Sequence, residues 1–344
     1  MVLIDISIEL LLIIIFVFSI ILVSLYAYLS CKHIKYTSQQ NKKKKYIEKK
    51  QHEWYQYLKN ETDFPITLIP KKDFEIQGIE EIFLTYVRNF TDSTVQNKIK
   101  QFSNEYLTNY YTKLLKSRSW SHRMIALYRI ADFHMDHLIE ECYKLEKRKL
   151  SKEERFQLLK IYALFAPKIF LKKLAEVDNL SDYELKKLLL NNDDWIMQKL
   201  IEQQNILDLD KQYSLIDSIG LKRNLDFLPF LESLLEHENL EIRIRSLKAI
   251  YEIGIITDPH KYLRFVKSPN WEERLMAGKL FEHFPLKQAR PYLEEMVHDQ
   301  SWWVRYQAAN TIMNNKGGKE ILQNIIITST DQYAIDIAKE VLNR

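Results

Sequence analysis

Hydrophobic residues follow two different patterns along this chain, one continuous and one periodic. From Leu10 to Cys31 no residue carries a charge. About 20 helical residues of this kind span roughly 30 Å, the thickness of the hydrocarbon core of a bilayer. From Gly78 onward, apolar residues recur instead at the spacing of amphipathic helices. The pattern predicts one membrane-crossing helix followed by a body built of helices.

The apolar run has one alternative interpretation, a cleaved signal peptide. Such a peptide needs a basic start, a shorter apolar core and small residues before the cleavage site. Here the run is preceded by the acidic Asp5 and Glu9, and Tyr28 to Ser30 form a poor cleavage or lipid-attachment site before Cys31. We therefore expect the run to remain in the protein as a transmembrane anchor.

The segment that follows the run is strongly basic. Lysine and arginine close to a membrane span stay preferentially on the cytoplasmic side. This asymmetry predicts a single-pass protein of the cell membrane with its N-terminus outside and its body in the cytoplasm. The same lysines are expected to contact anionic lipid headgroups. They are Lys32, Lys35, Lys42, Lys43, Lys44, Lys45, Lys49 and Lys50, set against the single Glu48.

Composition and charge agree with a helical, cytoplasmic body. Six glycines and eight prolines among 344 residues leave few residues for turns. The net charge of the lysine-rich segment alone exceeds the whole chain's net charge of +4, so the rest of the chain is close to neutral. A nucleic-acid-binding domain would carry a basic excess, so we expect no nucleic-acid partner. Cys31 and Cys142 have no spacing typical of a disulfide framework or a zinc site.

Two prolines mark an expected boundary before the body. Pro65 and Pro70 bias the residues before them to extended conformations, so we expect no single helix from the membrane into the body. A short helix is expected over residues 46–60. The predicted domains are the anchor at 1–31, a basic juxtamembrane helix and linker at 32–77, and the helical body at 78–344.

An internal repeat is visible in the body as an aromatic or apolar residue followed three positions later by a cation. Leu240, Trp271 and Trp302 stand 31 residues apart, and their cations are Arg243, Arg274 and Arg305. Weaker matches begin at Trp120 with Arg123, at Lys152 with Arg155, and at Trp195, where Gln198 replaces the cation. A last unit near Gln332 has Ile335 at this position, as expected of an end cap. Such periods indicate stacked helical units.

The steps around Arg243, Arg274 and Arg305 resemble HEAT-like repeats of the armadillo/HEAT superfamily, including the short bacterial variety with about 31 residues per unit. The resemblance is good from His237 to Asn315 and weaker from Trp120 to Gln204. It implies an all-α fold in which the membrane anchor is followed by a right-handed α-solenoid of helix pairs. It also implies that the repeat arginines bond to acidic or carbonyl groups of the adjoining unit.

The resemblance therefore makes the repeated side chains a structural ladder, and their fixed repeat position favours packing over ligand binding. A row of arginines and tryptophans is also able to bind phosphate groups or sugars, and this alternative stays open. Trp303 is different because the repeat does not require it, and it is our candidate for a protein-binding anchor. The ladder residues are Arg123, Arg243, Arg274, Arg305, Trp120, Trp195, Trp271 and Trp302.

Chemistry-bearing residues form one cluster. His134, His137 and Glu141 have the spacing that places three metal ligands on one face of a helix, close to Cys142. Some HEAT-like enzymes hold two irons with repeated His-Glu pairs, but His52-Glu53 and His237-Glu238 do not stand at matching repeat positions. The chain has no glycine-rich phosphate loop and no G-x-S-x-G motif. We expect no enzyme activity and no cofactor.

The expected function is that of a membrane-tethered cytoplasmic scaffold that binds protein partners through the solenoid surface. A polytopic membrane enzyme is one class of partner considered. Two alternatives remain. One is a metal-dependent enzyme that uses the His134 cluster. The other is a nucleic-acid binder that uses Lys42 to Lys45 near the membrane.

Overall fold

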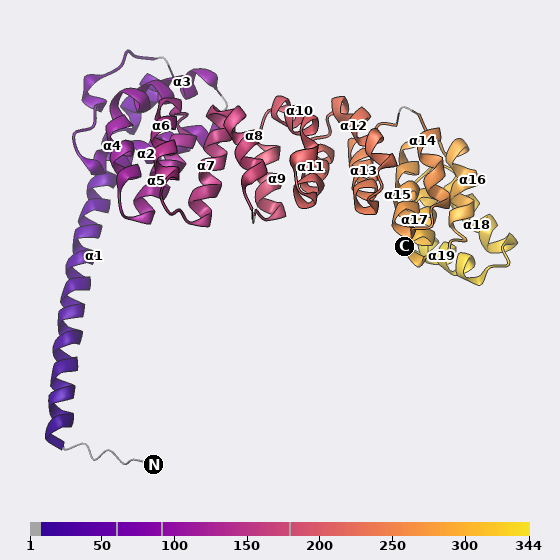
Figure 1. The fold of residues 1–344 in the computed structure, drawn as a ribbon, viewed down its shortest axis with the longest axis horizontal. Coiled ribbons are helices and arrows are strands. Elements are labelled where there is room, and N and C mark those ends of the chain that lie inside the picture. The colour runs from indigo at the N-terminus through magenta and orange to yellow at the C-terminus, as the bar shows by residue number, and fades with distance from the viewer. Residues whose placement is uncertain (1–7, 60, 91, 179, 257) are drawn as a thin grey trace. The chain divides into compact units, whose positions relative to one another are not determined.

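The computed structural model describes residues 8–59, 61–90, 92–178, 180–256 and 258–344, with side chains from Leu12 onward. Within these ranges every regular element is a helix (Figure 1), so the expected all-α fold is confirmed. Asp5 lies outside the described residues. The chain forms two compact units, residues 1–161 and 162–344, and each is described here by itself.

The first unit contains one long helix and a group of shorter ones. The helix α7 contains the boundary between the units. In chain order the elements are α1 (Ile8–Leu58), a 3₁₀ turn (Ile66–Leu68), α2 (Asp73–Asn89), α3 (Ser93–Phe102), a π-helical turn (Ser103–Leu107), α4 (Thr108–Lys116), α5 (Trp120–Asp132), a 3₁₀ turn (Asp136–Leu138), α6 (Ile139–Glu146) and α7 (Lys152–Phe165).

Helix α1 is continuous from the apolar run into the body, which differs from the expected boundaries at residues 31 and 78. No glycine or proline occurs before Pro65, so nothing in the sequence breaks the helix between the apolar run and Leu58. Its last turns belong to the core of the first unit, where Trp54 and Leu58 are fully buried. Pro65 and Pro70 act only after the helix has entered the body.

Aromatic rings hold the end of α1 in place. The Trp54 ring packs edge-on against Phe83 of α2 and Phe102 of α3, with centroids 4.9 and 4.8 Å apart. Edge-to-face pairs of this kind add about 0.5–1.5 kcal/mol each beyond the burial of their surface. The Trp54 indole N–H donates to the hydroxyl of Tyr46 at 3.3 Å. Burial raises the pKa of Tyr46 to about 12.

Helices α1 and α2 run in the same direction. Tyr46 of α1 lies against Gly78 of α2, and just beyond the C-terminal ends of both helices Lys59 lies over the ring of Phe90. The connecting segment returns along α1, where the Thr67 hydroxyl donates to Glu53 at 2.8 Å. A Cβ atom at position 78 would stand 2.6 Å from the Tyr46 ring, so glycine permits this close approach.

The second unit consists of helices that alternate between two layers. In chain order they are α8 (Pro167–Glu176), α9 (Asp182–Leu190), α10 (Asp194–Glu202), α11 (Leu209–Lys222), α12 (Leu228–Ser233), α13 (Leu240–Ile253), α14 (His260–Leu263), α15 (Trp271–Leu280), α16 (Leu286–Met296), α17 (Trp302–Met313), α18 (Gly318–Thr328) and α19 (Gln332–Leu342). Short 3₁₀ turns follow several of them, at Gln204–Ile206, Leu225–Phe227, Leu234–Glu236, Arg264–Lys267 and Phe281–His283.

The odd-numbered helices from α9 to α19 pack on one another in sequence and form one layer. The even-numbered helices form the other layer and pair with them, as α16 does with α17 and α18 with α19. Gly220 of α11 faces Ala249 of α13 so closely that an added Cβ would stand 2.7 Å from the Ala249 Cα. The unit is therefore a stack of helix pairs whose neighbours bury each other's apolar faces.

The structure corrects one repeat position. Trp195 lies on α10, which belongs to the even-numbered layer, whereas Leu240, Trp271 and Trp302 each begin an odd-numbered helix. The equivalent of Leu240 in the preceding repeat is Leu209, which is the first residue of α11 and stands 31 residues earlier. Trp195 was assigned by its ring alone, because amphipathic helices of both layers share one hydrophobic period.

At the position of the repeat cation, α11 carries a glutamine. The Gln212 side-chain amide donates to the backbone carbonyls of Gln204 and Leu207 at 3.3 and 2.9 Å. Glutamine thus makes the bonds to the preceding loop without the positive charge.

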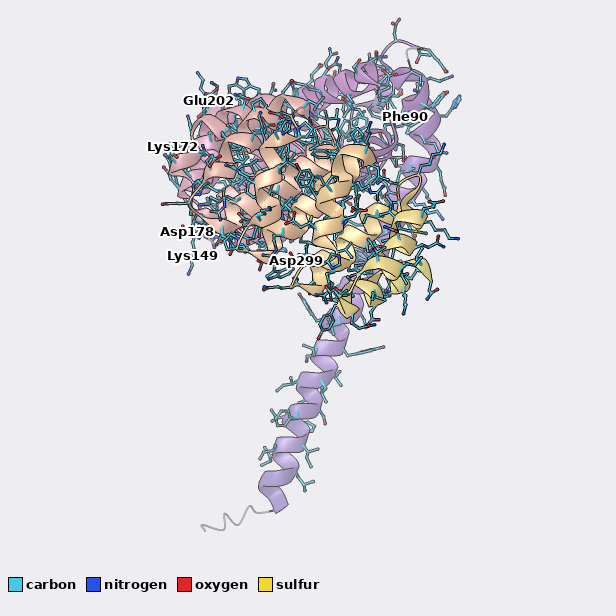
Figure 2. All side chains as sticks on the ribbon, turned by 90° about the vertical axis from the view of Figure 1, so that its right-hand side faces the viewer. Phe90, Lys149, Lys172, Asp178, Glu202 and Asp299 are labelled. Atoms are coloured by element: carbon cyan, nitrogen blue, oxygen red, sulfur yellow. The ribbon has the colours of Figure 1, made fainter. Side chains whose placement is uncertain are left out.

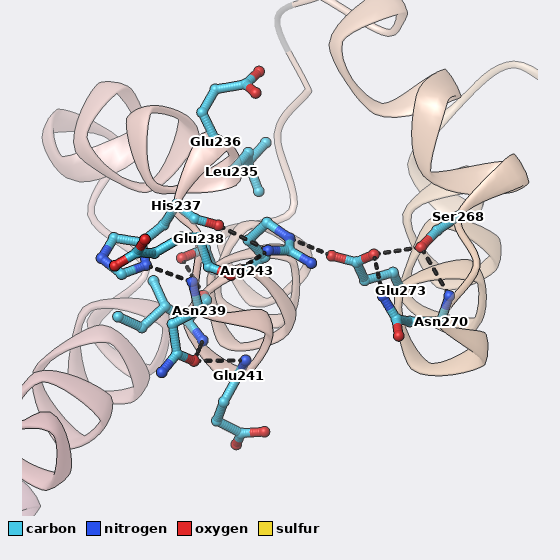
Figure 3. Close-up of polar contacts among 12 residues, drawn as sticks. Leu235, Glu236, His237, Glu238, Asn239, Glu241, Arg243, Ser268, Asn270 and Glu273 are labelled. Carbon is cyan, nitrogen blue, oxygen red and sulfur yellow. Dashed lines mark hydrogen bonds and ion pairs between the residues drawn. The ribbon is translucent and has the colours of Figure 1, made fainter.

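Arg123, Arg243 and Arg274 each bond to their own loop and to the next repeat, as Figure 3 shows for Arg243. Its Nη1 donates to the carbonyls of His237 and Glu238 at 2.8 and 3.0 Å, and its Nε donates to Glu273 of α15 at 2.6 Å. In the first unit Arg123 bonds in the same way to Glu154 of α7, also at 2.6 Å. We call these contacts the arginine ladder.

The ladder changes at its last steps. Arg274 binds both oxygens of the Asp299 carboxylate, at 2.6 and 2.9 Å. Arg305 donates to the carbonyls of Asp299 and Gln300, but its buried Nε has no acceptor among the described groups. Its guanidinium lies 5.2 Å from the centre of the Tyr333 ring in α19. The terminal unit therefore meets the last arginine with a ring in place of a carboxylate.

Removing one arginine of the ladder should destabilise the protein far more than removing a surface arginine. Arg274→Ala leaves the Asp299 carboxylate, 10% exposed, without its cation, and we expect a loss of about 2–4 kcal/mol in unfolding free energy. The matched control is Arg290→Ala, which removes the exposed Arg290–Glu294 pair and should change stability by less than about 0.5 kcal/mol. Denaturant titration of both variants measures the difference. Equal losses would contradict the ladder's structural role.

The ladder should also make stability depend on acid. Burial raises the pKa of the Glu273 carboxyl, but hydrogen bonds from Ser268 and Arg243 outweigh it and hold the pKa below its ordinary value of 4.5. The contribution is therefore complete above the unfolded-state pKa and is lost as pH falls through the folded-state pKa. We expect Glu273→Gln to lower the melting temperature at pH 7 and to reduce its further fall between about pH 5 and 3. Melting curves across this range test the prediction, and parallel falls in both proteins would contradict it.

Candidate functional site

The apolar half of α1 is a hydrophobic surface that the described residues do not cover. From Leu12 to Leu29 its large side chains are exposed, and none of the most apolar 18-residue window is buried. Figure 2 shows these side chains standing on a lone helix. It is the one described helix long and apolar enough to cross a membrane. Even its Ser19 hydroxyl is satisfied within the helix, by the Ile15 carbonyl at 2.8 Å, as a helix in lipid requires.

The eight lysines lie along α1 and differ in their surroundings. Lys43 pairs with Glu81 of α2 at 2.9 Å, and Lys50 pairs with Glu53 at 2.8 Å, so both face the body. The others are exposed; they are Lys32, Lys35, Lys42, Lys44, Lys45 and Lys49.

The histidine cluster does not have the geometry expected from its spacing. Helix α5 ends at Asp132, His134 adopts a left-handed backbone conformation with φ 53°, and α6 begins only at Ile139. His134 and Glu141 therefore do not share a helix. His137 Nε2 lies 2.8 Å from the Thr108 hydroxyl, and Glu141 pairs with Lys144 at 2.6 Å. No group of three metal-ligating side chains occurs among the described residues.

Cys142 is a core residue of the same region. It is fully buried on α6, and burial raises the pKa of its thiol to about 12. Metal binding and nucleophilic attack both require the thiolate, so this environment opposes both roles.

The repeat tryptophans lie at the first turns of helices and are partly exposed. Trp120, Trp271 and Trp302 begin α5, α15 and α17 and retain 49, 38 and 40% of their exposure. The Trp120 indole N–H donates to the hydroxyl of Ser151, just before α7, at 3.1 Å. In this repeat, therefore, Trp120 links neighbouring helices as Arg123 does.

Trp303 is the outer ring of an aromatic cluster at the end of the second unit. It is 57% exposed and packs edge-on against Trp302 at 4.8 Å. Trp302 in turn stacks on Tyr306 with centroids 5.0 Å apart, and Arg344 lies over the Tyr306 ring. The inner rings hold Trp303 in a fixed, solvent-facing position, which is typical of side chains that anchor a protein interface.

A polar cavity of about 580 Å³ lies across α9, α11 and α13, and sequence reasoning did not find it. The Ser214 hydroxyl donates to Asp182 at 2.7 Å, and Lys186 bridges Asp182 and Asp217 at 2.8 and 2.7 Å. Arg245 continues the chain of charges by contacting the same Asp217. Three successive helices thus join their charges into one network.

The network holds its charged groups in fixed orientations. Burial raises the pKa of Asp182, but the hydrogen bonds from Lys186 and Ser214 outweigh it, so the carboxyl's pKa lies below its ordinary value. The Arg245 guanidinium lies 4.9 Å from the centre of the Tyr213 ring, which lines the cavity. The cavity can therefore offer fixed charges of both signs to a polar ligand or peptide. Its members are about 30 residues apart in sequence, and no local motif reveals them.

Comparisons with known proteins give no family. No family model matches the chain, and no curated protein matches it. Among solved structures it is similar to two engineered proteins of the Northeast Structural Genomics Consortium. The first is 15% identical with a TM-score of 0.34, over 80% of this chain and 92% of that one. The second is 15% identical with a TM-score of 0.20, over 76% and 95%. The helix contacts described above, and not this likeness, define the fold.

The burial of Cys142 leads to a labelling prediction. In a Cys31→Ser variant the remaining thiol should not react with a maleimide at about pH 7.5 while the protein is folded, because it is both inaccessible and protonated. Denaturant should release one reactive thiol per chain. Mass spectrometry before and after unfolding measures both states. Rapid labelling of the folded protein would show that Cys142 is accessible and would reopen a chemical role for it.

Proposed function

We propose that this protein is a membrane-tethered scaffold whose helical-repeat body binds protein partners on the cytoplasmic side of the cell membrane. The finer assignment of the body to HEAT-like repeats rests on the sequence steps at Arg243, Arg274 and Arg305 and on the arginine ladder that they form. The proposal includes no enzyme activity and no cofactor.

The observation that carries the proposal is the continuity of α1. One helix presents an uncovered apolar surface over the length of a bilayer crossing and then enters the core of the first unit through Trp54 and Leu58. Burying such a surface in lipid is strongly favourable, and its lysine-rich flank favours a cytoplasmic body. An anchor of this kind raises the effective concentration of the body toward any partner in the same membrane.

The same continuity sets the distance between the body and the bilayer. Tyr46, whose ring lies against Gly78 of α2, stands 17 residues after Leu29, which is about 25 Å along a helix. Lys32 and Lys35 fall within the headgroup region, whereas Lys42 and those beyond it lie about 20–30 Å from the hydrocarbon. Surface charges are screened over about 8–10 Å in physiological salt. We therefore restrict the proposed lipid contacts to Lys32 and Lys35.

Two surfaces support protein binding by the body, namely the charge network around Asp182 and Arg245 and the exposed ring of Trp303. Fixed charges and rigid aromatic anchors both favour specific protein contacts. A polytopic membrane enzyme is the class of partner that a fixed anchor serves best, since both proteins are then confined to one bilayer.

Cell fractionation and crosslinking test the tether. We expect the full chain to stay in the membrane fraction after alkaline carbonate washing, and a chain lacking residues 1–29 to be soluble, because the removed segment contains the uncovered apolar surface. In-cell crosslinking and purification in mild detergent should recover a partner about tenfold or more better with the full chain.

A reporter fused after Arg344 completes the test. A reporter that works only in the cytoplasm should be active at this position, and one that works only after export should be inactive. Release of the full chain by carbonate, activity of an exported reporter, or equal partner recovery without the anchor would each overturn the proposal.

A further inference from the structure

An open groove of about 430 Å³ lies between α1 and α2 in the first unit. One wall carries Ile47, Gln51 and Tyr55 from α1, at the i, i+4, i+8 positions of one helical row, and the other carries Ile82 and Tyr86 from α2, at i and i+4, with Phe90 directly after the helix. Because the two helices run in the same direction, the two rows lie alongside each other. Parallel rows of this kind form the groove into which the ridge of a third helix packs.

The walls of the groove are partly apolar at the surface. Tyr55 of α1 is 42% exposed, and Phe90, which directly follows α2, is 38% exposed. Tyr86 stacks on Phe90 with centroids 5.4 Å apart, and Lys59 covers the ring at 4.5 Å. The side chains that line the groove come from α1, from α2 and from Phe90 directly after α2.

A basic stripe borders the groove on its α1 side. Lys42, Lys45 and Lys49 follow one another at i, i+3 and i+7, and the next position of the stripe, His52, lines the groove itself. All three lysines are exposed, and none forms an ion pair with a described side chain. If α1 crosses the membrane, these lysines lie beyond the reach of the headgroups, so lipid does not account for them. An acidic polypeptide flank would complement them.

We propose that the α1–α2 groove binds an amphipathic helix with acidic residues on one flank, supplied by the cytoplasmic part of a membrane-embedded partner protein. This inference rests on the proposed tether and names its docking site. The apolar residues of that helix, at i, i+4 and i+8 or i, i+3 and i+7, fill the groove between Tyr55 and Phe90, and its carboxylates meet the basic stripe.

The position of the groove along α1 points to a partner in the same membrane. The groove lies about 27–39 Å from Leu29 along the axis of a continuous helix. A helix that leaves the bilayer beside α1 reaches it after about 18–26 residues. A second copy of this chain is disfavoured as the occupant, because it would bring the same three lysines against the stripe and like charges repel.

Site-specific photocrosslinking of the full chain in cells tests the assignment. p-Benzoylphenylalanine replaces Tyr55 in one variant and Tyr183 in the control, since Tyr183 is also an exposed tyrosine but lies on α9. We expect a protein crosslink from position 55 and not from position 183. Mass spectrometry should map it to a cytoplasmic helix close to a transmembrane span, with acidic residues along one side. Crosslinks only to lipid, nucleic acid, a soluble protein or a second copy, or none at all, would overturn the proposal.

Charge reversal tests the role of the stripe. Combined Lys42→Glu, Lys45→Glu and Lys49→Glu should lower the crosslink yield from position 55 about tenfold or more. The matched control reverses the exposed Lys168, Lys248 and Lys319, which lie elsewhere, with the same change in net charge. Equal loss in both variants would overturn the charge argument.

A groove variant separates failure of this inference from failure of the tether. Tyr55→Glu with Phe90→Glu should lower anchor-dependent recovery of the partner to about the level of the chain without its anchor, while Cys142 stays protected from maleimide and so reports an intact first unit. Full recovery with this variant would remove the groove and leave the tether standing. Recovery that does not depend on residues 1–29 would remove the tether itself.

Discussion

The packing of Trp54 in the core of the first unit joins the body directly to the helix that carries the exposed apolar segment. The ring closes the core of the first unit between Phe83 and Phe102, and it lies on the same uninterrupted helix as the exposed apolar segment. In proteins most of the stability of a helix comes from the packing of one of its faces rather than from helix propensity. The last turns of α1 obtain that packing from the body, and its first half presents an apolar surface suited to lipid. Without the buried turns, the proposed anchor would be joined to the body by a flexible linker.

The helices of the second unit are short, and each buries only one face, so they are stable only together with their neighbours. Neighbouring pairs supply the missing surface, and the arginine ladder links them, because Arg243 and Arg274 each bind their own loop and a carboxylate of the next repeat. A buried carboxylate such as that of Asp299 is tolerated only with its cation in place. Each repeat therefore depends on the next repeat both for apolar contact and for charge compensation.

The sequence predicted those features that repeat, and it failed where partners come from distant segments. The 31-residue spacing located the first residues of α13, α15 and α17 because the arginine must stand at one place in each unit. Its acceptors, Glu273 and Asp299, depend on how successive helices are offset, which no local pattern encodes. The charge network around Asp182 was invisible for the same reason.

Three predictions from the sequence were wrong for identifiable physical reasons. Trp195 was placed by its ring, although the residue three positions later lacked a charge, and the 31-residue spacing from Leu240 already pointed to Leu209. The break expected after the anchor ignored the absence of glycine and proline throughout the lysine-rich segment. The histidine cluster was read as one helix because its spacing was helical, whereas His134 occupies the left-handed turn that ends α5.

Because α1 is continuous, a tilt of its membrane-spanning part would also move the first unit. Membrane helices are tilted by about 20° on average, and their tilt follows the thickness of the surrounding bilayer. With α1 as the anchor, a change of that size would move the point where Tyr46 enters the body sideways by roughly 9 Å, since this point lies about 25 Å beyond the hydrocarbon. Rotation of the anchor about its own axis would likewise turn the first unit through the same angle. Bilayer thickness would then set the direction in which the surfaces of the first unit face.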